Sequence, residues 1–157
     1  FFERKDISVI FVVRDPRDVA LSAMSYFYGT KDPVALEQVF DVMSGAKVSG
    51  KPWFGNWNQY ITEWLNRDPL ILRYEDLICD PEAELSRAFK VLELEYSHSG
   101  VVSAIENNSS GNRLAQGDSH VVVAKAERYR SELSDSQLEA CGQLFGNTLE
   151  TLGYSRT

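Results

Sequence analysis

Arg14 and Ser22 are the residues of this 157-residue chain whose types and spacing most directly suggest chemistry. Arg14 follows an apolar run at residues 7–13, and Ser22 comes eight residues later. A guanidinium group can hold a phosphate through two charge-assisted hydrogen bonds, and a hydroxyl can add an orienting bond. An alternative fits this segment equally well: Arg14 pairs with Asp15 or Asp18, and Ser22 occupies a helix groove. The segment by itself leaves both interpretations open.

The elements around Arg14 are predicted from local signals. The β-branched run at residues 7–13 is typical of a strand buried on both faces, as in a parallel sheet. Asp15 can cap a following helix, and Pro16 suits the first turn of that helix, where no backbone donor is needed. We therefore expect the strand to end at Arg14. This position is the carboxyl end of a central strand, where open α/β sheets bind ligands.

The helix after Pro16 is predicted to carry two different faces. One is an apolar stripe that packs on the sheet. The stripe consists of Val19, Ala20, Ala23, Met24 and Phe27. The neighbouring face carries Asp18, Ser22 and Ser25. This arrangement places Ser22 on one wall of a crevice, with Arg14 at its mouth.

Further along the chain, the patterns predict mostly helices. Helices are expected at residues 34–43, 53–66, 80–94, 99–107 and 134–152, a second buried strand at 69–74, a loop at 44–52, and a polar loop at 108–119. Inward-facing side chains are expected to include Val34, Trp57, Ile61 and Leu144. Ser134 and Gln137 predict a capping box at the start of the last helix.

The segment R-D-P-R-D-V-A-L-S at residues 14–22, followed by aromatic residues, resembles the 3′-phosphate-binding motif of sulfotransferases. These enzymes use 3′-phosphoadenosine 5′-phosphosulfate (PAPS). The resemblance implies that Arg14 and Ser22 hold the 3′-phosphate. The segment L-R-Y-E-D-L at residues 72–77 also resembles the family and implies that Tyr74 lines the adenine pocket. The alternative for Tyr74 is a buried ring whose hydroxyl is bonded to the backbone.

The chain departs from the family pattern at residues 108–126. Sulfotransferases usually carry a Ser-Phe pair and then an Arg-x-Gly loop here, but this chain lacks the aromatic residue and the Arg and Gly of that loop. Ser109 is still expected to contact the nucleotide. Lys125, Arg128 or Arg113 is expected to supply the missing positive charge, although a lysine does not reproduce a bidentate clamp.

Charge and composition restrict the function classes. Sixteen basic and 23 acidic side chains give a net charge of −7, which argues against general nucleic-acid or membrane-surface binding. No apolar run approaches the roughly 20 residues that cross a membrane. Cys79 and Cys141 are interpreted as reduced thiols of a cytoplasmic protein, with a single disulfide as the alternative. His98 and His120 have no companion ligand at zinc spacing, so no metal is expected.

The resemblance implies an α/β fold, with a P-loop NTPase-like parallel sheet and flanking helices. The chain contains no G-x-x-x-x-G-K-[ST] loop and does not begin with Met. We therefore expect residues 1–157 to be the helix-rich C-terminal part of a single domain of bacterial type. The phosphate loop and the catalytic base would lie in the absent N-terminal part, and the chain alone is predicted to be inactive.

The leading functional hypothesis is a sulfotransferase that moves a sulfuryl group from PAPS to an acceptor hydroxyl or amine of a small molecule or glycan. Two alternatives stay open. One is a non-catalytic remnant of the fold that acts in binding or packing. The other is a fragment of a P-loop nucleotide kinase, although a kinase lid usually needs several arginines and the predicted polar loop offers only Arg113.

Overall fold

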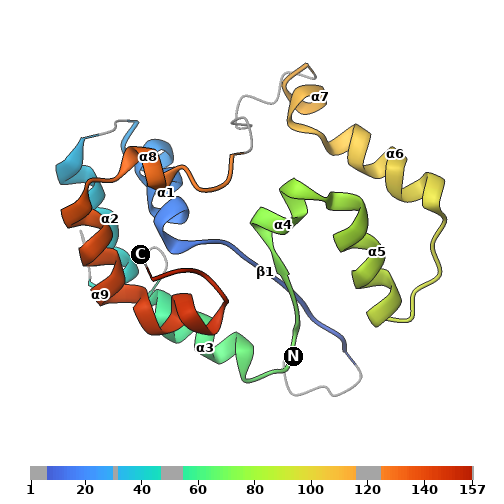
Figure 1. The fold of residues 1–157 in the computed structure, drawn as a ribbon, viewed down its shortest axis with the longest axis horizontal. Helices are drawn as coiled ribbons and strands as arrows, with labels where there is room; N and C mark the ends of the chain where they lie inside the picture. Colours follow the sequence, from blue (N-terminus) through green and yellow to red (C-terminus); the bar gives the residue numbers. More distant parts are fainter. Residues whose placement is uncertain (1–6, 30–31, 47–54, 116–124, 157) are drawn as a thin grey trace. The chain divides into compact units, whose positions relative to one another are not determined.

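The computed structural model describes residues 7–29, 32–46, 55–115 and 125–156, which fall into two compact units (Figure 1). The first, here the sheet unit, comprises the described residues of Phe1–Val13 and Pro69–Ala126. The second, the helical unit, comprises those of Arg14–Asp68 and Glu127–Thr157. Most of the predicted loop at 44–52, and Trp53 at the predicted start of a helix, lie outside the described residues.

The sheet unit is built on two parallel strands. Strand β1 (Ile10–Val13) pairs with β2 (Leu70–Arg73), and the register joins Ile10 to Leu70 and Val13 to Arg73. The helices of this unit are α4 (Tyr74–Cys79), α5 (Pro81–Val91), α6 (His98–Asn108) and α7 (Ser110–Ala115). Helices α4 and α5 both contact β2, and α5 also contacts α6. The prediction of an α/β fold with a parallel strand pair and many helices is confirmed at this level.

Strand β1 is not buried on both faces, and that prediction was wrong. Phe11 and Val13 are buried, but Ile10 is 45% exposed and Val12 is 52% exposed. Successive side chains of a strand point to opposite faces, so these four residues define one covered face and one open face. Within the described part of the chain, β1 pairs with β2 alone.

The polar stretch predicted as a loop at residues 108–119 is partly helical. Helix α7 forms because the Ser109 hydroxyl accepts a hydrogen bond from the Asn112 backbone N–H at 3.3 Å, as a capping residue does. The sequence predicts a nucleotide contact for Ser109 but not this capping bond. Residues 116–119 lie outside the described part of the chain.

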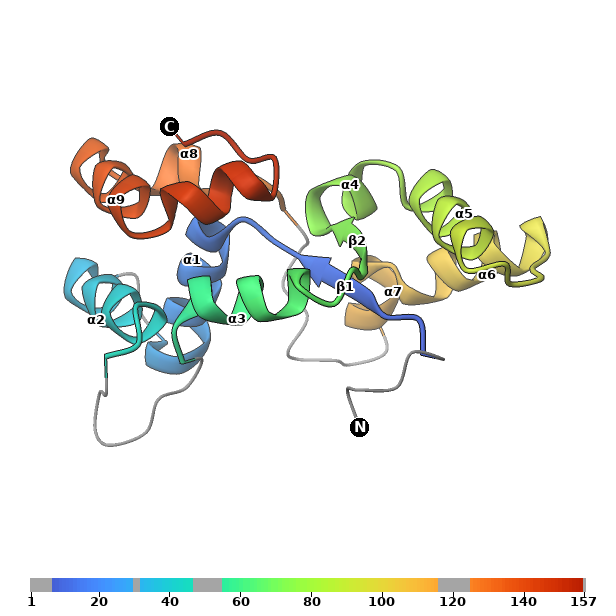
Figure 2. The same cartoon turned by 90° about the horizontal axis from the view of Figure 1, so that it is seen from below.

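The helical unit consists of α1 (Pro16–Tyr28), α2 (Pro33–Met43), α3 (Trp57–Leu65), α8 (Tyr129–Glu132) and α9 (Asp135–Thr151). Figure 2 shows α1 beside both α2 and α9, and contacts join both pairs. The fully buried side chains of this unit include Leu21, Met43, Phe145 and Leu149. Trp57 packs edge-on against Phe145, with ring centroids 5.7 Å apart.

The predicted inward faces of these helices were partly wrong. Phe27, Val34 and Leu144 are exposed, whereas Leu21 is buried although it was not assigned to the apolar stripe. Helix α3 also begins four residues later than expected, at Trp57, because the Asn56 side chain caps it. Local spacing gives the period of a helix, but its rotation is set by the neighbours against which it packs.

Asp-Pro pairs start three of the helices. The side chains of Asp15, Asp32 and Asp80 accept hydrogen bonds from backbone N–H groups in the first turns of α1, α2 and α5, at 2.9–3.0 Å. Each following proline occupies the first turn, where its missing N–H costs nothing. At its other end α1 finishes at Gly29, whose φ of 61° lies in the left-handed region that glycine adopts without strain.

Cys79 is exposed and Cys141 is buried, and both are free thiols. No helix in the described ranges is both long enough and apolar enough to cross a membrane. The same ranges contain no group of three or more His, Cys, Asp or Glu side chains that could hold a metal ion.

Candidate functional site

Arg14 lies directly after β1 and directs its guanidinium along the first two turns of α1. Its Nη1 donates a hydrogen bond to the Ser22 Oγ at 3.3 Å, and its Nη2 lies 3.4 Å from the Asp18 Oδ2. Residues 14, 18 and 22 follow one another at four-residue intervals, so they meet along one side of the helix start. The contact of Arg14 with Ser22 and the alternative pairing with Asp18 therefore occur together in the structure. The Arg14 side chain is 20% exposed and Ser22 is half-buried.

Asp18 connects Arg14 with a distant part of the chain. Its side chain is fully buried, and its Oδ1 accepts a hydrogen bond from the Tyr129 backbone N–H at 3.0 Å. Burial raises the pKa of Asp18, and this outweighs the Tyr129 N–H and the charge of Arg14, which both lower it. One carboxylate oxygen of Asp18 thus accepts a hydrogen bond from the start of α8, and the other contacts Arg14.

Arg17 is a fully buried arginine next to this cluster, and sequence reasoning did not identify its role. Its Nε and Nη2 donate to the two oxygens of Asp15 at 2.9 and 2.7 Å, and Nη2 also donates to the Ser155 backbone carbonyl at 2.8 Å. The guanidinium carbon lies 3.8 Å from the centre of the Tyr129 ring. Burial lowers the pKa of Arg17, but the hydrogen bond and charge of Asp15 outweigh this effect and raise it above its ordinary value.

A sequence signal for this second pair did exist. Asp15 is the helix cap, and Arg17 is two residues later, where a long side chain at the first turn can fold back onto the cap. The partner that could not be found from the sequence is Ser155, because 138 residues separate it from Arg17.

Arg128 belongs to the same unit as Arg14 and Ser22. Its Nε and Nη2 donate to the two carboxylate oxygens of Glu132 at 2.8 and 3.2 Å. The hydrogen bonding of Arg128 to Glu132 is the main cause that raises the pKa of Arg128, and the charge of Asp18 contributes to the same shift. The structure therefore brings Arg14 and Ser22 into direct contact and places Arg128 within electrostatic range of Asp18.

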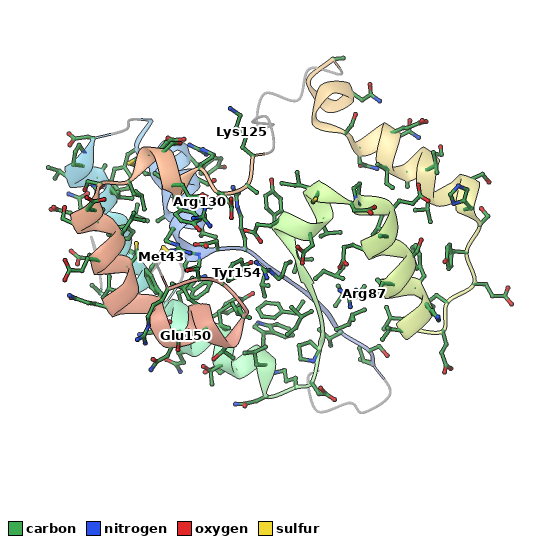
Figure 3. All side chains as sticks on the ribbon, viewed as in Figure 1. Met43, Arg87, Lys125, Arg130, Glu150 and Tyr154 are labelled. Carbon is green, nitrogen blue, oxygen red and sulfur yellow. The ribbon has the colours of Figure 1, made fainter. Side chains whose placement is uncertain are left out.

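The other predicted binding residues lie in the sheet unit. Tyr74 is half-buried and begins α4 directly after β2. Tyr74 follows Arg73, which is the register partner of Val13 in the strand pair. Ser109 is exposed and caps α7, and the Lys125 side chain is exposed (Figure 3). Arg113 lies within α7.

Comparison with known proteins shows to which family the chain belongs. The sulfotransferase domain family matches residues 1–145, which is most of the chain. This chain belongs to the sulfotransferase domain family. The resemblance inferred from residues 14–22 and 72–77 is thereby confirmed, whereas the assignment to a bacterial type stays a prediction. The match also favours the sulfotransferase hypothesis over a nucleotide kinase fragment.

Individual relatives show how much of a sulfotransferase this chain represents. It is 29% identical to cytosolic sulfotransferase 15 of Arabidopsis thaliana, over 98% of this chain and 49% of that protein. It is 30% identical to sulfotransferase 2A2 of Rattus norvegicus, over 87% of this chain and 54% of that protein. Identity to carbohydrate sulfotransferase 1 of Danio rerio is 27%, over 96% of this chain and 39% of that protein. The chain thus spans about half the length, or less, of these relatives.

Proposed function

We propose that the protein transfers a sulfuryl group from PAPS to an acceptor hydroxyl or amine, and that this chain holds the 3′-phosphate of the donor. Membership in the sulfotransferase domain family supports the reaction class. The observation that carries the assignment of the site is the contact between the Arg14 Nη1 and the Ser22 Oγ, at 3.3 Å. It shows that a guanidinium and a hydroxyl eight residues apart converge at one point.

The donor groups fit a phosphate. A guanidinium presents planar N–H donors to phosphate oxygens, and a serine hydroxyl can donate one further bond to the same group. The Arg14 side chain is partly exposed, while its partner Asp18 is fully buried. The carboxylate therefore reaches the guanidinium from the protein side, which suits an anion that arrives from solvent.

The remaining predicted residues take subsidiary roles in this proposal. We assign the adenine ring to Tyr74, whose aromatic face can stack on a purine, and a polar contact to Ser109. Lys125 and Arg128 contribute positive charge. The fork of Arg128 is bonded to Glu132, so its contribution is long-range attraction unless the ligand displaces that carboxylate.

PAPS supplies the activated sulfuryl group, and the acceptor oxygen or nitrogen displaces it in line. Positioning and electrostatic stabilisation then supply most of the rate enhancement. The residues assigned here bind and orient the nucleotide, and none of them is a base for the acceptor. The chain spans about half of its relatives, so we propose that it is part of one P-loop NTPase-like domain and is inactive alone. A cytoplasmic location is proposed in line with the name of the Arabidopsis relative.

Calorimetry of the full-length protein with adenosine 3′,5′-bisphosphate tests this proposal. We expect Arg14→Ala to weaken binding by about 2–4 kcal/mol, the loss typical of a charged phosphate contact. Arg67→Ala is a matched control, because it removes an exposed arginine at the end of α3 and should leave affinity unchanged. Unchanged affinity in Arg14→Ala would refute the assignment. Binding without any sulfuryl transfer from PAPS would favour the non-catalytic alternative.

A further inference from the structure

We infer that Asp18 is a positioning residue of the 3′-phosphate site, which fixes the Arg14 guanidinium toward Ser22 and ties this arrangement to α8. This inference rests on the proposed function, because it assigns Asp18 a role that acts through Arg14. The sequence predicts Asp18 on the same helix face as Ser22 and leaves its pairing with Arg14 as one of two open interpretations. The structure shows that it also has a second, distant partner.

Two separate segments meet on the Asp18 carboxylate. Its Oδ2 faces the Arg14 Nη2 at 3.4 Å, and its Oδ1 accepts the Tyr129 N–H at 3.0 Å. Tyr129 is 111 residues further along the chain. A carboxylate with both oxygens engaged has its position and its plane fixed, and a fixed carboxylate in turn limits where Arg14 can point.

Tyr129 is itself firmly held. Its ring is buried and lies against the guanidinium of Arg17, 3.8 Å from the guanidinium carbon to the ring centre. Arg17 is fixed by both oxygens of Asp15 and by the Ser155 carbonyl. The Tyr129 backbone N–H that donates to Asp18 therefore belongs to a residue whose ring is packed against a hydrogen-bonded guanidinium. When such supporting bonds already position a binding side chain, less conformational entropy is lost when the ligand binds.

The charge of Asp18 works against this role and makes the inference testable. A carboxylate beside a phosphate repels it, so Asp18 can help binding only if orientation of Arg14 outweighs this repulsion. Both oxygens of Asp18 face hydrogen-bond donors, which offsets the negative charge of the carboxylate. Removal of the Asp18 charge should therefore weaken nucleotide binding. Charge repulsion alone would predict tighter binding.

Asp18→Asn in the full-length protein separates the two functions of this side chain. The amide oxygen can still accept the Tyr129 N–H, so α8 keeps its contact. The amide nitrogen then faces the Arg14 Nη2, and two N–H donors cannot bond each other. We expect about tenfold weaker binding of adenosine 3′,5′-bisphosphate, within the range measured for coupled neighbours. Binding of adenosine 5′-monophosphate, which lacks the 3′-phosphate, should be unchanged.

Three comparisons decide the outcome. Asp18→Asn should have no further effect in the Arg14→Ala background, because its role requires Arg14. Asp41→Asn, an exposed charge change on α2, should leave both affinities unchanged. Equal losses for the two nucleotides, an additive loss in the Arg14→Ala background, or tighter binding of the bisphosphate would each overturn the inference. By contrast, Arg14→Ala with unchanged bisphosphate affinity would overturn the proposed function itself.

Arg14→Lys tests the same inference without touching the buried carboxylate. Lysine keeps the charge at a partly exposed position but lacks the fork that spans Asp18 and Ser22. We expect this variant to melt like the wild type and to lose most of its preference for the bisphosphate over the monophosphate. A preference equal to that of the wild type would show that the held fork is not needed.

Discussion

Replacement of Arg17 by methionine tests the importance of the buried ion pair at the start of α1. Arg17 is fully buried, and Asp15, its partner, is 2% exposed. Methionine has a similar length and flexibility, so Arg17→Met removes the charge while leaving a small cavity at most. The Asp15 carboxylate then loses both side-chain hydrogen bonds from Arg17 and keeps the bond from the Arg17 backbone N–H at 2.9 Å.

The expected loss follows from the bonds that disappear. Removal of one partner of a buried ion pair typically costs about 3–5 kcal/mol, because a buried charge is left uncompensated. Here the Ser155 carbonyl also loses its donor. Two features place the effect at the lower end of that range. Asp15 retains its capping bond, and the Arg17 Nη1 has no hydrogen-bond partner among the described residues. We therefore expect a loss of about 3 kcal/mol in the free energy of unfolding.

Urea unfolding of the full-length protein, followed by circular dichroism, measures this loss. The matched control is Arg67→Met, an exposed arginine of the same unit, which should change stability by no more than about 0.5 kcal/mol. The double variant Asp15→Asn/Arg17→Met should recover about 1–2 kcal/mol, since asparagine can cap α1 without a buried charge. A loss below about 1 kcal/mol in Arg17→Met, or no recovery in the double variant, would refute the reasoning.

Two further predictions concern α9 and the thiols. Ser134→Ala removes the hydroxyl of a capping box and should lower the free energy of unfolding, measured in urea, by about 1 kcal/mol. The control Ser136→Ala, in the same first turn, should lower it by less. Equal effects of the two substitutions would contradict the capping role of Ser134. Burial raises the pKa of Cys141 to about 12 from 9.0, so peptide mapping after iodoacetamide should find Cys79 modified in the native protein and Cys141 modified only after unfolding. Because the pKa of Cys141 is higher in the folded state, this thiol stabilises the fold below pH 9, and its contribution disappears as the pH rises toward 12. The free energy of unfolding of Cys141→Ala should therefore fall less steeply than that of the wild type as the pH rises through this range.

Local chemistry could be predicted from the sequence because it depends on short, fixed spacings. The Asp-Pro starts of α1 and α5 and the Ser134 capping box are formed as expected, whereas the Asp32 cap of α2 was not predicted. The spacing of Arg14 and Ser22 also needs only a helix start between them, so their contact was within reach of sequence reasoning. The family could be inferred for the same reason, since its motifs are short contiguous segments.

Only the tertiary structure decided which partners these residues share. Whether Arg14 met a hydroxyl or a carboxylate was undetermined from the sequence, and the structure contains both contacts. The bond from the Tyr129 N–H to Asp18 and the burial of Arg17 depend on how α1, α8 and the C-terminal segment pack together. Such contacts join residues more than 100 positions apart, and no local period encodes them. The exposed face of β1 is decided in the same way, because a strand's pattern shows that a side chain is apolar but not whether anything covers it.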